Sequence, residues 1–205
     1  MDKRVAIVDL GLGNIGAVVN MLRRAGGTDC LVSDPNELNQ YSKVLLPGVG
    51  SFDAGISKLD LAGFRSALHD YASSGRALLG ICLGMQLLAD DSEEGRMPGL
   101  GLVPGTVKRF SFEQERALKV PHMGWSQVSH SKSHPLIMGL DDSARFYFVH
   151  SYYFKCEDEQ DELLSTQYGV NFSSGVQRNN VMGVQFHPEK SHRYGMQLIK
   201  NFVEL

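Results

Sequence analysis

The chain has 205 residues, 42% of them hydrophobic, and its 20 Lys and Arg residues nearly balance its 23 Asp and Glu residues. This apolar fraction is enough for a buried core and excludes a disordered chain. A formal net charge of −3, with no dense run of Lys or Arg, argues against nucleic acid or an anionic membrane surface as the main partner.

Cysteine usage and hydropathy predict a cytoplasmic protein. The three cysteines stand far apart at positions 30, 82 and 156 and are odd in number, which argues against a disulfide framework. No apolar run has the length of a membrane span, and the apolar stretch 5–8 is too short for a signal peptide. Cys30 and Cys156 have no unusual neighbours and are interpreted as structural.

The first half of the chain predicts strands that alternate with helices. Short apolar runs predict strands at 5–9, 30–32, 44–46 and 77–81. Helices are expected over residues 15–24, 61–73 and 84–89. Short apolar strands separated by helices are typical of a parallel sheet that is buried on both faces.

The second half predicts a smaller antiparallel sheet that folds back onto the first half. Its strand candidates are 103–110, 145–149, 152–155, 163–167 and 181–186. Ser191 is expected to be the N-cap of a final helix, whose apolar stripe is Met196, Ile199, Phe202 and Val203. No segment resembles a linker, so residues 1–205 are predicted to form a single domain.

A glycine-rich loop follows the first predicted strand. Residues 11–16 (GLGNIG) match the dinucleotide fingerprint G-x-G-x-x-G, and Asp34 stands near the expected ribose position. However, Pro35 directly follows Asp34, and the βαβ unit between Gly11 and Asp34 would be small. We therefore favour a structural or partner-facing loop over a nicotinamide site.

A candidate nucleophile stands where the strand 77–81 runs into a helix. Cys82 is flanked by Gly80 and Gly84, which is the pattern of a nucleophile elbow with Cys in place of Ser. The sharp bend exposes the thiol, and unpaired N–H groups at the helix start favour the reactive thiolate. The N–H of Leu83 is expected to donate to an oxyanion. The alternative is an inert buried cysteine.

A candidate base follows a late apolar strand. His187 and Glu189 are two positions apart, so their side chains project from the same side of an extended chain, and Pro188 fixes the backbone between them. A thiol nucleophile needs a base with an orienting carboxylate, which this pair can provide. The alternative is a strand-end histidine beside an exposed glutamate. His130 and His134 have the i, i+4 spacing of metal ligands on a helix, but their segment is predicted to be a loop. No metal site is therefore predicted.

Together these motifs resemble the triad class of glutamine amidotransferases, through residues 80–86 (GICLGMQ) and 185–189 (QFHPE). Four further segments resemble the glutaminase subunit of imidazole glycerol phosphate synthase: 47–50 (PGVG), 121–125 (PHMGW), 147–152 (YFVHSY) and 190–191 (KS). The resemblance implies a flavodoxin-like α/β core with a mainly parallel central sheet and a smaller antiparallel sheet. It also implies hydrolysis of L-glutamine to glutamate and ammonia, without a cofactor or metal.

The resemblance assigns roles to individual residues. The catalytic triad would be Cys82, His187 and Glu189, and the oxyanion would be met by Leu83 and, after a peptide rearrangement, by the strand that contains Val49 and Gly50. The implied glutamine contacts are Gln86, Glu94, Ser151 and Tyr152. The implied contacts with the partner are Asn14, Trp125 and Lys190.

The same resemblance implies a partner. Glutaminases of this kind dock as a heterodimer on a (β/α)₈-barrel cyclase that uses the ammonia to make imidazole glycerol phosphate and an aminoimidazole ribotide in histidine biosynthesis. Ser126 departs from the family's usual Asn, so a paralogous glutaminase that serves a sugar amidotransferase of surface-polysaccharide assembly is an alternative. A stand-alone thiol hydrolase or peptidase is an alternative of another class.

Overall fold

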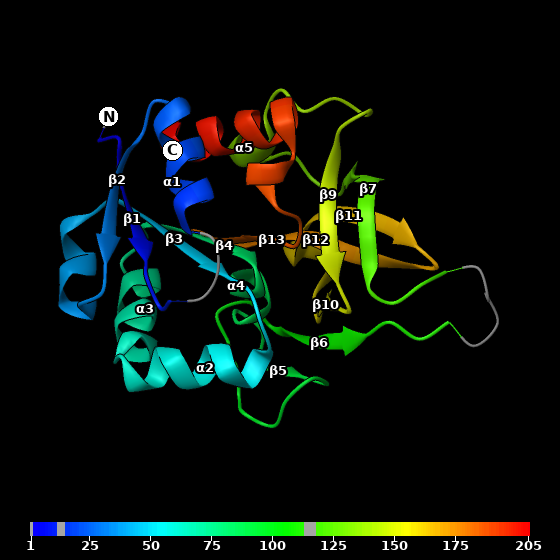
Figure 1. Ribbon diagram of the computed structural model, residues 1–205, viewed down its shortest axis with the longest axis horizontal. Coiled ribbons are helices and arrows are strands. Elements are labelled where there is room, and N and C mark those ends of the chain that lie inside the picture. Colours follow the sequence, from blue (N-terminus) through cyan, green and yellow to red (C-terminus); the bar gives the residue numbers. More distant parts are fainter. Residues whose placement is uncertain (1, 12–14, 113–117) are drawn as a thin grey trace.

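The computed structural model describes residues 2–11, 15–112 and 118–205. Its centre is a long sheet with helices on both faces, and a two-stranded sheet lies beside it (Figure 1). In the described ranges the strand order of the large sheet is β2-β1-β3-β4-β13-β12-β10-β6-β5, with β11 paired to β12 and β8 to β11.

The first five strands of this order run parallel to one another. Their bounds are Arg4–Val8 (β1), Thr28–Val32 (β2), Lys43–Gly48 (β3), Ala77–Cys82 (β4) and Val181–Val184 (β13). β13 comes from the end of the chain, yet it pairs directly with β4, with Gly183 opposite Gly80. Since parallel strands end at the same edge of a sheet, the segments that follow β4 and β13 become neighbours.

The other strands are mainly antiparallel. β12 pairs antiparallel with β13, β11 and β10, while β7 and β9 form the separate two-stranded sheet. The bounds are Asp91–Ser92 (β5), Gly105–Arg109 (β6), His122–Gln127 (β7), Ser129–His130 (β8), Arg145–His150 (β9), Tyr152–Cys156 (β10), Glu162–Tyr168 (β11) and Val170–Arg178 (β12). A parallel core with an antiparallel addition confirms the predicted fold class.

Helices cover both faces of the parallel strands (Figure 1). Their bounds are Ile15–Arg24 (α1), Phe52–Leu61 (α2), Phe64–Ser73 (α3), Leu83–Gln86 (α4) and His192–Glu204 (α5). Val5 and Ile7 of β1 belong to the core with α1 and α5, whereas Ala6 and Val8 belong to the core with α2 and α3. This alternation follows from the two-residue period of a strand. None of the helices in the described ranges is long and apolar enough to cross a membrane.

Some elements differ from the sequence predictions. The helix expected over 61–73 is present but begins at Phe64, and the helix Phe52–Leu61 before it was not predicted; the two are separated where Gly63 adopts a φ of 74°. The strands β7 and β12 were not predicted. In β7 the more buried alternate positions are His122, Gly124 and Ser126, so this strand lacks the apolar alternation that predicts a strand.

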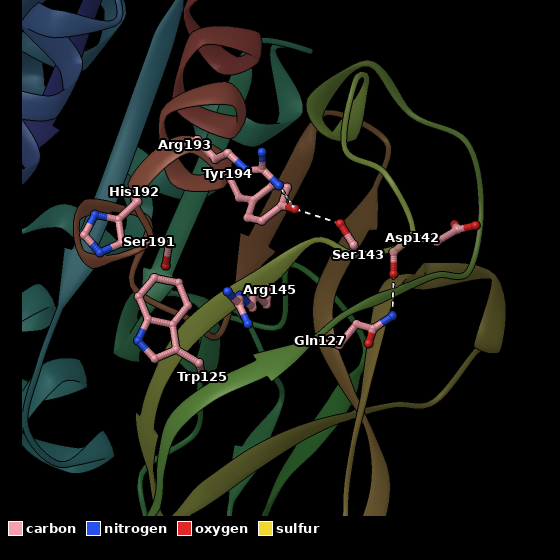
Figure 2. A pocket seen from close by; sticks show the side chains of 9 residues that line it. All are labelled: Trp125, Gln127, Asp142, Ser143, Arg145, Ser191, His192, Arg193 and Tyr194. Atoms are coloured by element: carbon pink, nitrogen blue, oxygen red, sulfur yellow. Dashed lines mark hydrogen bonds between the residues drawn. The ribbon is translucent and has the colours of Figure 1, made fainter.

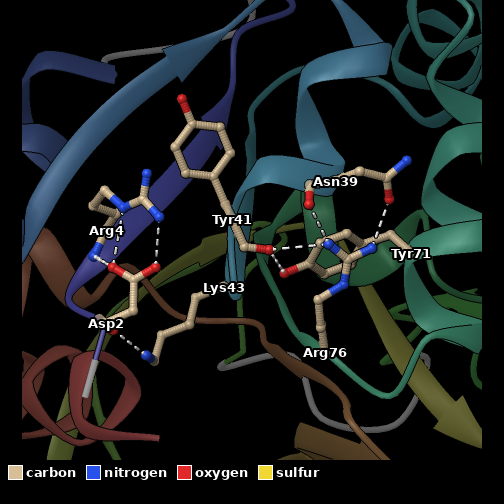
Figure 3. Close-up of polar contacts among 7 residues, drawn as sticks. All are labelled: Asp2, Arg4, Asn39, Tyr41, Lys43, Tyr71 and Arg76. Carbon is tan, nitrogen blue, oxygen red and sulfur yellow. Dashed lines mark hydrogen bonds and ion pairs between the residues drawn. The ribbon is translucent and has the colours of Figure 1, made fainter.

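A cluster of polar residues fixes the amino ends of the strands (Figure 3). Nζ of Lys43 is buried and donates to the backbone oxygen of Asp2 (2.7 Å). Nη1 of Arg76 donates to the backbone oxygen of Asn39 (2.9 Å), and its guanidinium lies 4.3 Å from the ring centroid of Tyr71. Lys43 and Arg76 stand at the starts of β3 and β4, so this cluster stabilises the edge of the sheet opposite Cys82.

Candidate active site

The chain bends sharply at Cys82, where β4 passes into α4. Cys82 has a φ of 55° and a ψ of −110°, and a residue other than glycine at positive φ carries backbone strain. Its side chain lies at the carboxyl edge of the sheet and is only 8% exposed, so the expectation of an exposed thiol is wrong: neighbouring side chains cover the bend. This backbone has the strained bend that the sequence predicts for a nucleophile elbow.

The glycines two positions before and after Cys82 are required by close packing. A Cβ atom on Gly84 would overlap the backbone oxygen of Leu46 on β3, and one on Gly80 would overlap the backbone of Gly84. Neither glycine has a positive φ. Lack of space therefore excludes larger residues here, and the bend depends on how tightly β3, β4 and α4 pack.

His187 follows β13 and lies at the same edge of the sheet as Cys82. Its Nδ1 is 2.8 Å from Oε1 of Glu189, and the two side chains are 7% and 10% exposed. The second carboxylate oxygen of Glu189, Oε2, has no hydrogen-bond partner among the described residues. Among the described residues, the buried carboxylate of Glu189 forms its ion pair with the imidazole of His187.

The environment of His187 favours its protonated form. Burial alone lowers the pKa of the imidazole, but hydrogen bonds and charge interactions with Cys82 and Glu189 outweigh it and raise the pKa to about 10. The interactions with Cys82 and Glu189 therefore favour the imidazolium form of His187. An imidazole next to a thiol is the arrangement that a cysteine nucleophile requires.

This raised pKa predicts that stability falls at alkaline pH. A histidine whose folded pKa exceeds its unfolded value stabilises the fold fully below pH 6.5, and this stabilisation is lost as the pH rises toward about 10. Urea unfolding across this range should show a decline in the free energy of unfolding that is much shallower in His187→Gln. Parallel curves for the two proteins would contradict the prediction.

Ser191 fixes the backbone of His187 and does not cap the helix as predicted. It occupies the N-cap position of α5, but its side chain makes no cap hydrogen bond. Its Oγ instead donates to the backbone oxygen of His187 (2.6 Å) and accepts from the N–H of Tyr147 (3.0 Å). The buried hydroxyl of Ser191 makes both hydrogen bonds, and it thereby links the start of α5 to β9 and to the backbone of His187.

The predicted oxyanion segment lies beside Cys82. Gly48, the last residue of β3, pairs with Cys82 in the sheet, and a Cβ atom on Gly48 would lie 3.2 Å from Cβ of Leu83. Val49 is 43% exposed. Gly50 has a φ of 109° with no atom close to the position of a Cβ. This left-handed glycine in open space gives the segment conformational freedom.

The predicted glutamine contacts differ in their surroundings. Gln86 is buried, and its Nε2 donates to the backbone oxygen of Tyr152 (3.0 Å) and to Oε1 of Gln185 (2.9 Å). Ser151 is half-buried, next to Tyr152. Glu94 accepts from the N–H of Phe52 (2.8 Å) and thereby caps the start of α2. A role for these residues in substrate binding stays a prediction.

Gln185 also lies at the site, although the sequence motifs did not predict it. Its side chain is fully buried, and its Nε2 lies 3.9 Å from Sγ of Cys82 as a hydrogen-bond donor. The available signal was a polar residue between Val184 and Phe186 at the end of an apolar strand, where a buried amide requires partners.

A family model described as glutamine amidotransferase class-I matches residues 6–205. The chain belongs to the class-I glutamine amidotransferase family. It is 48% identical over 202 residues to the imidazole glycerol phosphate synthase subunit HisH 2 of Pseudomonas aeruginosa, covering 98% of this chain and 99% of that protein. The subunit of the same name from Methanococcus maripaludis is 44% identical, covering 98% of each chain.

A solved structure supports the same fold. PurLQS from Thermotoga maritima aligns with a TM-score of 0.72 at 18% identity, covering 100% of this chain and 99% of that chain. The family predicted from the residue motifs is therefore confirmed, and the amidotransferase has the parallel core with an antiparallel addition that the resemblance implied.

Two of the predicted partner-facing residues of this amidotransferase, Trp125 and Lys190, lie on its surface. Trp125 is 44% exposed and stacks on His192 at 5.3 Å, and Nζ of the exposed Lys190 lies 5.4 Å from the ring centroid of Tyr147. Trp125 lines a pocket of about 1200 Å³, and Figure 2 shows the side chains that surround this pocket. Asn14 lies outside the described residues.

The described residues around Asp34 and the glycine loop do not support the alternative of a dinucleotide site. Oδ1 of Asp34, the candidate ribose ligand, accepts from the N–H of Asn36 and caps the turn Pro35–Gln40. Residues 12–14 of the glycine loop lie outside the described ranges.

Proposed function

We propose that this amidotransferase hydrolyses L-glutamine through Cys82, His187 and Glu189. The observation that carries the proposal is the imidazole of His187, held by Glu189 at 2.8 Å and in electrostatic contact with Cys82, whose sulfur lies on a strained bend. A nucleophile, a base and a group that orients the base are the three parts that acyl transfer requires.

The proposed reaction has two halves. The Cys82 thiolate attacks the side-chain amide carbon of glutamine, His187 gives its proton to the leaving nitrogen, and the C–N bond breaks to release ammonia and leave a γ-glutamyl thioester. Water then attacks the thioester carbon and gives a proton to His187, and the C–S bond breaks to release glutamate. The thiolate and the imidazolium are thereby restored.

The oxyanion of each tetrahedral intermediate needs donors. We assign one to the N–H of Leu83 and a second to the segment that contains Val49 and Gly50, after a rearrangement of its peptide. The open space around Gly50 supports this assignment, because the peptide can rotate there without a clash. Loss of one oxyanion donor costs about 3 kcal/mol of transition-state stabilisation, so the position of this segment can switch the activity on.

We further propose that the ammonia passes to a (β/α)₈-barrel cyclase subunit. The relatives from Pseudomonas aeruginosa and Methanococcus maripaludis carry the name of a synthase subunit and match this chain along nearly its whole length. The proposed heterodimer is imidazole glycerol phosphate synthase, which makes imidazole glycerol phosphate and an aminoimidazole ribotide in histidine biosynthesis. Trp125, Lys190 and Asn14 are proposed to face the cyclase.

Labelling by a reactive substrate analogue tests the proposed nucleophile. A glutamine analogue with an electrophilic carbon in place of the amide should label Cys82 of the assembled complex, and an excess of glutamine should prevent the reaction. Peptide mapping identifies the modified residue. Labelling at Cys30 or Cys156, or none in a complex that hydrolyses glutamine, would refute the proposal.

Truncation of Trp125 tests the proposed interface. Trp125→Ala should weaken binding of the cyclase by about 2 kcal/mol, because large aromatic side chains dominate interface energetics. Calorimetric titration measures the change. Leu61→Ala is the matched control, since Leu61 is 89% exposed and lies on α2. Equal affinities for the two variants would contradict the assignment.

The second candidate function differs from the first in the protein that accepts the ammonia. A paralogue that serves a sugar amidotransferase would have the same chemistry at Cys82, and Ser126 in place of the usual Asn favours this alternative. Reconstitution decides between them: stimulation of glutamine hydrolysis by the cyclase, and none by a sugar amidotransferase, is the expected result. Strong peptide or ester turnover without any partner would instead favour a stand-alone hydrolase.

A further inference from the structure

A pair of buried histidines joins the small sheet to the active site. His122 on β7 and His150 on β9 are opposite one another and are 2% and 6% exposed. The ring of His122 stacks against Phe148 and Tyr168, and that of His150 lies 5.2 Å from the ring of Phe110. Imidazoles in such apolar surroundings have to find hydrogen-bond partners within the protein.

The hydrogen bonds of these histidines can run in only one direction. Burial lowers the pKa of His150 to about 3 and that of His122 to about 4, so both rings are neutral. Nδ1 of His150 is 2.7 Å from the backbone oxygen of Tyr152, which only accepts, so Nδ1 carries the proton and Nε2 is an acceptor. That acceptor faces Nδ1 of His122 at 3.0 Å, which must therefore donate.

The outer end of this series is on the strand that carries Trp125. With Nδ1 of His122 protonated, its Nε2 is an acceptor, and it lies 2.8 Å from Oγ of Ser126. The hydroxyl of Ser126 therefore donates to His122. The side chains of Trp125 and Ser126 project from opposite sides of β7, so Ser126 points inward behind the exposed indole.

The inner end of the series reaches Cys82. The Tyr152 oxygen that accepts from His150 also accepts from Nε2 of Gln86 (3.0 Å), so both of its lone pairs are used. Nε2 of Gln86 donates to Gln185 as well, and Gln185 is the donor to the sulfur of Cys82. One continuous set of hydrogen bonds thus runs from β7 to the sulfur.

We propose that Ser126, His122 and His150 are positioning residues for glutamine: they hold the backbone at Tyr152, and with it Gln86, in the geometry that binds the substrate beside Cys82. This inference rests on the glutaminase function proposed above. None of the three is proposed to contact glutamine. Their surroundings support the proposal, because apolar side chains would pack equally well among these aromatic rings but could not fix the Tyr152 oxygen.

Substitution of His150 tests this role in the assembled glutaminase complex. His150→Leu removes the donor to Tyr152 and should raise KM for glutamine at least about tenfold, with kcat changed much less, because a binding contact is lost. His150→Asn is the matched variant, since its amide N–H can take the place of Nδ1–H, and it should restore most of the loss. The rate at which iodoacetamide alkylates Cys82 should change little in either variant.

Ser126 provides a second test that does not disturb the buried rings. Ser126 is half-buried, so Ser126→Ala should fold normally, and it should raise KM by about threefold because it removes one hydrogen bond at the end of the series. Ser126→Thr keeps the hydroxyl and should resemble the wild type. Thermal unfolding of every variant serves as the check that the fold is retained.

The outcomes separate this inference from the proposed function. An unchanged KM in both His150→Leu and Ser126→Ala, with normal turnover that depends on Cys82, would overturn the positioning role alone. Equal losses in His150→Leu and His150→Asn would also overturn it, because bulk rather than hydrogen bonding would then be responsible. Turnover that persists in Cys82→Ala would refute the glutaminase mechanism, whatever the histidine variants do.

Discussion

Cys82→Ala is expected to lower glutamine hydrolysis in the reconstituted complex by at least about ten-thousand-fold, the scale of loss when the nucleophile of a triad is removed. Cys30→Ala and Cys156→Ala should keep most of the activity. Burial raises the pKa of the Cys156 thiol to about 11, so this residue is almost entirely in the unreactive thiol form at neutral pH. Release of glutamate from labelled glutamine measures the effect.

Added ammonia gives this experiment an internal control. If the Cys82→Ala chain folds and docks normally, the complex should still complete the synthase reaction when an ammonium salt replaces glutamine. A loss with both nitrogen sources would place the defect in folding or assembly. Full activity with glutamine would show that Cys82 is not the nucleophile and would remove the basis of the proposed mechanism.

Gly84→Ala is expected to have the largest effect on stability, with a loss of more than about 4 kcal/mol, which is exceptional for a single substitution. The added Cβ would overlap the backbone oxygen of Leu46, and a backbone atom within a sheet cannot move aside. Gly55→Ala is the matched control on α2. Its Cβ would meet only the ends of the Leu83 and Leu87 side chains, and alanine favours the helix by about 1 kcal/mol.

Denaturant unfolding of the two variants tests this difference. Gly55→Ala should unfold within about 1 kcal/mol of the wild type, because the gain in helix propensity offsets the small repacking. Gly84→Ala should unfold at a much lower denaturant concentration or fail to accumulate as folded protein. Similar stabilities for the two variants would show that β3 and α4 are not packed as closely as the structure has them.

Much of the parallel core could be predicted from the sequence, because local patterns are enough to predict its elements. Strands buried on both faces are short apolar runs, such as the strand that ends at Cys82, and the helix over residues 15–24 was predicted in the same way. The boundary between α2 and α3 could not be predicted in this way. It depends on Gly63 in a left-handed conformation, and a glycine can also continue a helix at modest cost.

The sequence by itself determined the sharp bend at Cys82 and that His187 and Glu189 can pair, because both are local consequences of glycine spacing and strand periodicity. Only the tertiary structure decided that this pair lies beside Cys82, since the pairing of β13 with β4 joins segments far apart in the chain. It also decided that Gln86, Gln185 and the two buried histidines form one hydrogen-bonded set. Buried polar groups take their partners from whatever the fold brings near, and no local pattern specifies them.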